Sequence, residues 1–201
     1  MHTRSLSAKA ANDGYAKPFS LIKKKKNNSM KISSISKGDI LAFKGKDENF
    51  KIIFCTSTYK KRSPHNFTFA GTDINQDEKP TIEKVIESNF FGIGNGLNKY
   101  TSFFKEEEIK QMWNLHPEIN PYHLGSYGFL IWRKDFLKFR DNLELIGNIE
   151  IIDNLDKNGN GSMNSSSWES LNNVFTNNFE EVMNQRGQKK YRVKAILKNK
   201  N

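Results

Sequence analysis

The stretch that decides the fold runs from Pro121 to Asp153 and reads PYHLGSYGFLIWRKDFLKFRDNLELIGNIEIID. Within it, residues 128–132 are uncharged, with charged residues directly after them. Such a run predicts a strand buried on both faces, with Trp132 in the core. The apolar residues of 136–139, separated by charges, predict a short helix. Two further apolar runs flank Gly147-Asn148 and predict either a tight hairpin or one strand with a glycine bulge.

Three strands are predicted before this stretch and one after it. Apolar runs bounded by turn residues indicate strands at 39–43, 50–56 and 66–72, and the alternation in the third predicts that it is half exposed. Residues 191–197 predict a last edge strand or the start of a basic tail. The glycines of 90–96 predict a flexible loop, because their spacing fits neither the dinucleotide motif nor the P-loop.

Helices are predicted from apolar residues three and four positions apart. They are a short helix over 81–87 with a threonine cap, a second over 103–115, and one amphipathic helix that starts after Ser166 or Ser167 and ends near Arg186. Together with the strands, they predict an α+β fold. We expect a curled antiparallel sheet, or a small partly open barrel, with two to three packed helices.

Basic residues gather at both ends of a chain whose net charge is +10. Residues 1–30 carry seven Lys or Arg and one acid, residues 186–201 carry seven and no acid, and the remainder holds 18 basic and 21 acidic residues. We expect a disordered basic extension over 1–29, a single domain over 30–185, and a basic C-terminal strand or tail over 186–201. Basic tails bind nucleic acid weakly and without sequence choice.

The single cysteine and the short apolar runs indicate where in the cell the protein is expected to lie. Cys55 has no partner for an internal disulfide, and its apolar neighbours predict a small buried side chain. No apolar run has the length of a membrane helix. We therefore expect a cytoplasmic protein without membrane contact. Residues 1–12 also have some features of an organelle presequence, and Met30 could be an alternative start.

The catalytic and metal motifs are incomplete. The four histidines form no zinc motif, and Gly125-Ser126-Tyr127-Gly128 lacks the spacing of a nucleophile elbow. A pair of Ser126 with His123 is the enzyme alternative, although residues three apart rarely position a base on a nucleophile. We expect no catalytic residue, no metal and no cofactor.

One loop copies the first half of a calcium-binding loop. Asp156, Asn158 and Asn160 occupy ligand positions one, three and five, and a glycine follows, as in the EF-hand and dockerin loops that the segment resembles. Position twelve, which should supply a carboxylate, is Ser167. A turn leading into the next helix is the preferred interpretation, and calcium binding at 156–167 stays open.

Aromatic and basic side chains gather around the central strand. Interface hot spots favour Tyr, Trp and Arg, so we expect this group to bind a protein partner. The residues assigned to that role are Tyr122, His123, Tyr127 and Arg133. Such residues also form stacking platforms for single-stranded nucleic acid. The alternative function is therefore nucleic-acid association through the basic tails and a basic loop. That loop holds Lys60, Lys61 and Arg62.

Two pieces of the chain together are similar to a known family. The first is GDILAF at 38–43 with the strand at 50–56, and the second is GSYGFLIWRK at 125–134 with LIGNI at 145–149. Across roughly residues 37–152, they resemble an all-β immunity-protein family of bacterial polymorphic toxin systems, the one usually numbered twenty-six. The chain departs from it in its inserted helix and helical C-terminus.

The resemblance implies a small cytoplasmic protein without chemistry of its own, which blocks a cognate toxin by occluding the toxin's site. It assigns no contact residue in this chain. The first functional hypothesis is therefore a non-enzymatic protein-binding module, and more specifically an immunity protein that neutralises a bacterial toxin.

Overall fold

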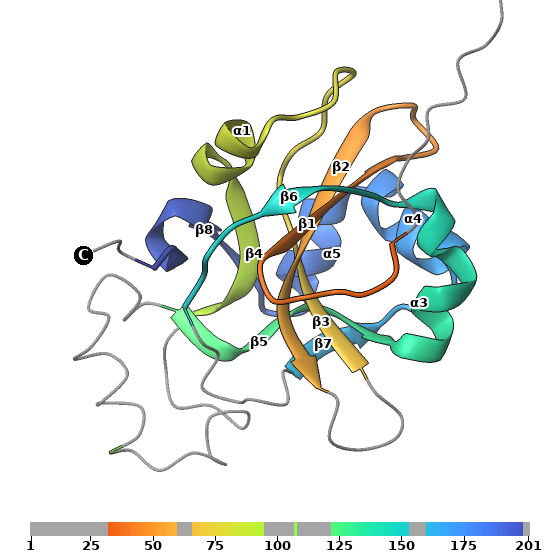
Figure 1. Cartoon of the computed structure of the whole chain (residues 1–201). Coiled ribbons are helices and arrows are strands. Elements are labelled where there is room, and N and C mark those ends of the chain that lie inside the picture. Colours follow the sequence, from red (N-terminus) through yellow and green to blue (C-terminus); the bar gives the residue numbers. More distant parts are fainter. Residues whose placement is uncertain (1–31, 60–65, 95–106, 108–121, 153–159, 199–201) are drawn as a thin grey trace, which may run out of the picture.

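The computed structural model describes residues 32–59, 66–94, 107, 122–152 and 160–198 (Figure 1). The predicted helix over 103–115 falls outside this part of the chain, apart from Glu107. Within the described residues, the strands are β1 (Asp39–Lys44), β2 (Phe50–Tyr59), β3 (Asn66–Gly71), β4 (Asn89–Gly94), β5 (Tyr122–Trp132), β6 (Glu144–Asn148), β7 (Asn160–Asn164) and β8 (Lys189–Arg192). The α-helices are α1 (Ile82–Glu87), α3 (Arg133–Phe139), α4 (Trp168–Thr176) and α5 (Phe179–Gln185), and the 3-10 helices are η3 (Arg140–Asn142) and η4 (Val193–Ile196).

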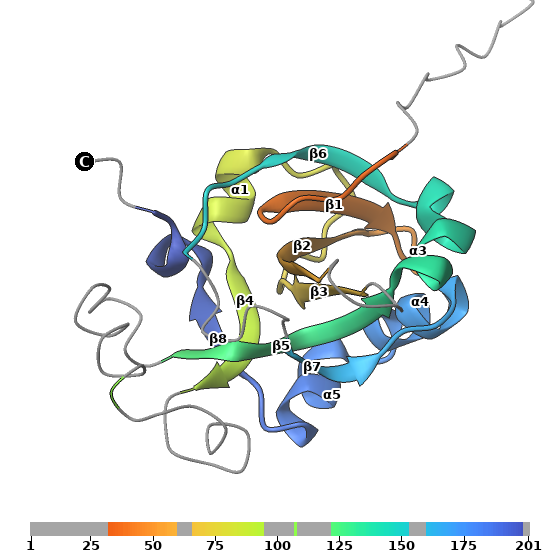
Figure 2. The same ribbon diagram turned by 60° about the horizontal axis from the view of Figure 1, so that its bottom comes forward.

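The strands form one sheet in the order β6-β1-β2-β3-β5-β4-β8, and every pairing along this path is antiparallel. The strand β7 joins β5 as a parallel neighbour, which makes the sheet mixed. Figure 2 shows the path curling from β6 at the top, through β1, β2, β3 and β5, to β4 and β8 on the left. The predicted α+β class is confirmed, and the curled sheet is not closed into a barrel.

The two ends of this path come together without a full strand pairing. Beyond β6, Ile151 forms an isolated bridge with Leu197, which follows β8. The amide of Ile152 donates to the carbonyl of Ile196 at 3.0 Å, and the amide of Lys198 donates to that of Glu150 at 2.9 Å. We call this contact between residues 150–152 and 196–198 the C-terminal clasp.

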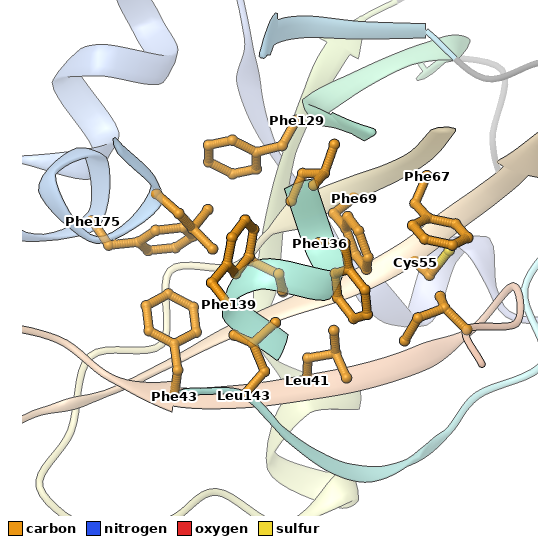
Figure 3. Packing of buried hydrophobic residues seen from close by; sticks show 14 of the residues in the cluster. Leu41, Phe43, Cys55, Phe67, Phe69, Phe129, Phe136, Phe139, Leu143 and Phe175 are labelled. Atoms are coloured by element: carbon orange, nitrogen blue, oxygen red, sulfur yellow. The ribbon is translucent and has the colours of Figure 1, made fainter. Parts of the chain in front are cut away.

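The sheet is buried on both faces by two apolar clusters. On one face, α3, α4 and α5 cover the strands, and Figure 3 shows aromatic side chains from both layers pointing toward one another. The rings of Phe175 and Phe179 stack with centroids 4.1 Å apart, and Phe43 meets Phe175 edge-on at 5.1 Å. On the other face, α1, η4 and residues 149–152 supply the cover. Cys55 is fully buried in the first cluster, as predicted.

This double cover explains two departures from the sequence predictions. Residues 67–71 of β3 are all buried, so the expectation of a half-exposed strand is wrong. The predicted glycine-rich loop at 90–96 is instead strand β4 as far as Gly94, with Phe90 and Phe91 fully buried in opposite clusters. Pairing with β5 and β8 satisfies the backbone of β4.

The predicted long C-terminal helix is two helices. Ser167 caps α4, because its side chain accepts a hydrogen bond from the amide of Ser170 at 3.1 Å. The helix ends at Thr176, and Asn178 adopts a left-handed conformation with φ of 56°. Asparagine tolerates this conformation better than most residues. The chain can therefore turn between the helices while Phe175 and Phe179 both stay in the core.

Other local predictions are confirmed. Strands β1 and β2 lie at their predicted places, α1 carries the threonine cap at Thr81, and α3 includes the short helix expected after the central strand. Around Gly147, a single strand is observed only for the first apolar run: β6 pairs with β1, its register shifts beside that glycine, and it ends at Asn148. The second run, residues 149–152, lies beyond β6 and forms one isolated bridge at Ile151. In the described part of the chain, no helix is long and apolar enough to span a bilayer.

Candidate functional site

Among the residues whose burial the structure describes, Trp132 at the end of β5 is a large exposed aromatic residue. Its side chain is 38% exposed, so the prediction that it lies in the core is wrong. The alternation of a strand gives the reason, since Phe129 and Ile131 enter the helix-covered cluster while Leu130 and Trp132 do not. The chain then turns directly into α3, and Trp132 stays at the surface.

The outer side of α3, which follows Trp132 directly, carries basic side chains. The helix buries Asp135, Phe136 and Phe139, and leaves Arg133, Lys134, Leu137 and Lys138 wholly or partly exposed. The ammonium group of Lys134 lies 4.7 Å from the centroid of the Trp132 ring, in a cation–π contact. Leu137 is 42% exposed. We call Trp132, Arg133, Lys134 and Leu137 the α3 face.

A small pocket of about 80 Å³ lies beside Trp132, where β5, β7 and α3 meet. It is lined by Leu130, Trp132, Asp135, Asn164, Ser165 and Ser166. Asp135 is buried, and its carboxylate accepts a hydrogen bond from Lys138 at 2.8 Å. Ser165 donates its amide to the carbonyl of Leu130 at 3.1 Å, which fixes its place in the pocket wall.

A second, larger and more polar cleft of about 260 Å³ lies between the end of α4, the start of α5 and residues 72–75. At its wall, the buried Lys51 donates to Asp47 at 2.6 Å and also to the side chain of Asn75. Burial alone would raise the pKa of the Asp47 carboxyl, but the hydrogen bond and the attraction from Lys51 outweigh burial and hold this pKa below its ordinary value. Glu180 lines the same cleft and pairs with Lys190 at 2.6 Å.

This polar cleft is a weaker candidate for a binding site than the α3 face and its pocket. Its lysine is already held by two acceptors, and two of its carboxylates, those of Asp47 and Glu180, are each held by a lysine. Among the described residues, no group of three or more His, Cys, Asp or Glu side chains is arranged to hold a metal ion. In the sequence, Lys51 stands out because it is the one charged residue in the run FKIIFC of β2.

Comparison with known proteins gives no relative. No family model, curated protein sequence or solved structure matches this chain. The resemblance to the immunity-protein family therefore stays a prediction.

The structure describes the side chains of only some of the predicted site residues. Arg133 lies on the α3 face, next to Trp132. Tyr122, His123 and Tyr127 lie on β5, as does Ser126, but their side chains are outside the described part of the structure. The loop with Lys60, Lys61 and Arg62 is also outside it.

The proposed calcium loop is described only from Asn160 onward. Residues 160–164 form strand β7, and Ser167, at the twelfth position, caps a helix. Sequence reasoning missed Ser165 as a site residue. The signal was faint, because a serine in the run NSSS before a helix is expected to be a cap.

Proposed function

We propose that this protein is a non-enzymatic protein-binding module that docks through the α3 face onto an acidic surface of its partner. In the specific form that the family resemblance implies, the partner is a bacterial toxin, and docking occludes the toxin's site. The observation that carries the proposal is the 38% exposed Trp132, which lines a pocket and has the ammonium group of Lys134 over its ring.

The geometry has the features of an interface hot spot. Hot spots are enriched in Trp, Tyr and Arg, and they lie next to pockets that a partner can fill. Trp132 and Arg133 are adjacent in sequence, and the exposed Leu137 adds apolar surface on the same helix. A partner that covered this face would remove the indole and Leu137 from water, which favours association.

The charge of the α3 face indicates what kind of surface it meets. Helix α3 carries three basic side chains and one acid, Asp135, which is buried and paired. Lys134 and Lys138 are both exposed, and Lys134 lies over the Trp132 ring. An acidic partner surface would complement this charge and speed up encounter, whereas a basic surface would be repelled.

Nucleic acid is the competing partner, because the same residue types can stack on bases. In the structure, Lys134 lies over the Trp132 ring, so a base stacking on that side would have to displace it. Residues 31–185 are also mildly acidic as a whole. These observations favour a protein partner, and nucleic-acid binding is an outcome that the experiment can detect.

The experiment isolates the partner with the full chain as bait and then measures binding of the purified pair by calorimetry. We expect Trp132→Ala and the charge reversal Arg133→Glu/Lys134→Glu each to weaken binding, the first by about 30-fold or more. Leu145→Ala is the matched control, because Leu145 is 44% exposed on β6 and lies outside the α3 face. If the partner is a toxin, its activity should fall to zero at one equivalent of wild-type protein.

Two results would overturn the proposal. One is a partner that binds Trp132→Ala as tightly as the wild type. The other is an absence of protein binding together with tight binding of a single-stranded oligonucleotide that depends on Trp132. Circular dichroism of each variant verifies that the fold is intact, which we expect because Trp132 is exposed.

A further inference from the structure

Ser165 has a hydroxyl group that its surroundings do not use. The residue is 1% exposed, and its Oγ has no hydrogen-bond partner within the described part of the chain. The hydroxyls of Ser57 and Thr68 share this property, but they line neither this pocket nor the two larger clefts around residues 72–76. Ser165 is different because it lines the pocket beside Trp132.

The pocket around this hydroxyl is small and mostly apolar. Leu130 and the Trp132 ring contribute apolar surface, and Ser165 brings an unpaired polar group. Its volume of about 80 Å³ is enough for a few waters or for one short side chain. A short side chain of the partner would fill a pocket of this size.

The charge of the pocket wall limits the ligand further. Asp135 is part of the lining and is buried. An entering carboxylate would be repelled by this side chain and would also lose its hydration. Lys138 already pairs with Asp135, so an entering cation would compete with an existing ion pair. An uncharged group avoids both costs.

We propose that this pocket receives one short, uncharged side chain of the protein partner, with the size of threonine or asparagine, whose oxygen hydrogen bonds with the Ser165 hydroxyl. The inference rests on the proposed function and names the anchor of that interface. An unpaired buried hydroxyl costs free energy, and a bound oxygen restores the missing hydrogen bond. The anchor enters beside the Trp132 ring, while the basic residues of α3 meet the acidic surface around it.

The first test uses side-chain analogues on the full chain, without the partner. Ethanol stands for threonine, acetamide for asparagine and acetate for aspartate, and each is titrated while amide chemical shifts are recorded. We expect ethanol and acetamide to shift the amides of Leu130 and Ser165 saturably at millimolar to molar concentration, and acetate not to do so. The matched pair of variants is Ser165→Ala and Ser166→Ala, since Ser166 is exposed at the same pocket. Only Ser165→Ala should weaken the effect.

The second test measures stability and partner affinity. We expect Ser165→Ala to leave Tm unchanged or to raise it, because an unpaired buried hydroxyl is removed, and to weaken partner binding by about tenfold. A lower Tm would show that the hydroxyl has a structural hydrogen bond, and that result overturns the inference.

The inference and the proposed function can fail separately. Partner binding that depends on Trp132 but not on Ser165 overturns the anchor and keeps the α3 face as the interface. If neither Trp132→Ala nor Ser165→Ala weakens partner binding, both the anchor and the α3 face are overturned. Both are also overturned if the pocket binds acetate more tightly than ethanol and no protein partner depends on Trp132.

Discussion

Lys51 and Asp47 form an ion pair whose two members differ in their access to water. The distance between Nζ and Oδ2 is 2.6 Å, yet the lysine side chain is 3% exposed and the aspartate side chain is 33% exposed. A buried charge that loses its partner is costly, whereas an accessible one can be hydrated. The two halves of this pair should therefore respond differently to mutation.

We expect Asp47→Asn to destabilise the protein by about 1–3 kcal/mol, because it leaves the buried ammonium of Lys51 with neutral acceptors only. Lys51→Met should cost less than about 1 kcal/mol, because methionine fills the apolar space and the remaining carboxylate reaches solvent. Urea unfolding of both single variants and the double variant measures the difference. A larger loss for Lys51→Met would contradict the assignment of lysine as the buried member.

The same pair predicts a pH dependence. The pKa of Asp47 is lowered from about 3.8 in the folded state, because contacts with Lys51 and with the Asn49 amide outweigh the effect of burial. A lowered pKa stabilises the fold above the unfolded-state pKa, and this contribution is lost as pH falls through the folded-state value. The Tm of the wild type should therefore approach that of Asp47→Asn as pH falls below about 4. Parallel Tm curves between pH 6 and pH 2 would show that the pair does not titrate in this way.

Gly71 of β3 is in close contact with two aromatic rings of the core. A Cβ atom placed there would lie 2.4 Å from Cζ of Phe179 and 2.9 Å from Cζ of Phe175. These rings are stacked on each other and cannot withdraw without disturbing the cluster. We expect Gly71→Ala to cost about 1–3 kcal/mol in thermal or urea unfolding.

Gly147→Ala is the matched control for this substitution. The added Cβ would meet only the Ile82 side chain, at 2.4 Å from Cδ1, and this half-buried side chain can rotate away. The cost should stay below about 1 kcal/mol. Equal losses of unfolding free energy in the two variants would mean that the core rings move aside as readily as the Ile82 side chain.

The C-terminal clasp predicts that η4 stabilises the open side of the sheet. Ile196 is buried, and its carbonyl accepts a hydrogen bond from Ile152. We expect Ile196→Ala to cost about 2–4 kcal/mol and to speed hydrogen exchange at the amides of Ile152 and Lys198. Lys194→Ala on the same turn is the control, and should change stability by less than about 0.5 kcal/mol because its side chain is exposed. Unchanged exchange at Ile152 in the Ile196 variant would show that the clasp is not needed to hold the sheet ends.

Local features of the fold could be predicted because short-range chemistry determines them. The apolar runs of β1 and β2, the cap at Thr81, the helix after the central strand and the burial of Cys55 depend on residues close in sequence. Local sequence patterns predicted less of the candidate site. Arg133 was predicted to bind a partner, which stays a prediction, whereas the place of Ser165 beside Trp132 depends on the pairing of β7 with β5.

The amino-acid sequence by itself determined the α+β class and the position of most of the strands, because apolar periodicity is a property of neighbouring residues. Only the tertiary structure decided that residues 90–94 are a strand, since their backbone is satisfied by β5 and β8, which follow much later in the chain. It also decided that Trp132 is exposed while Phe129 is buried. The reason is that a residue's burial depends on which distant elements cover it, and α3, α4 and α5 cover only one face of β5 at that point.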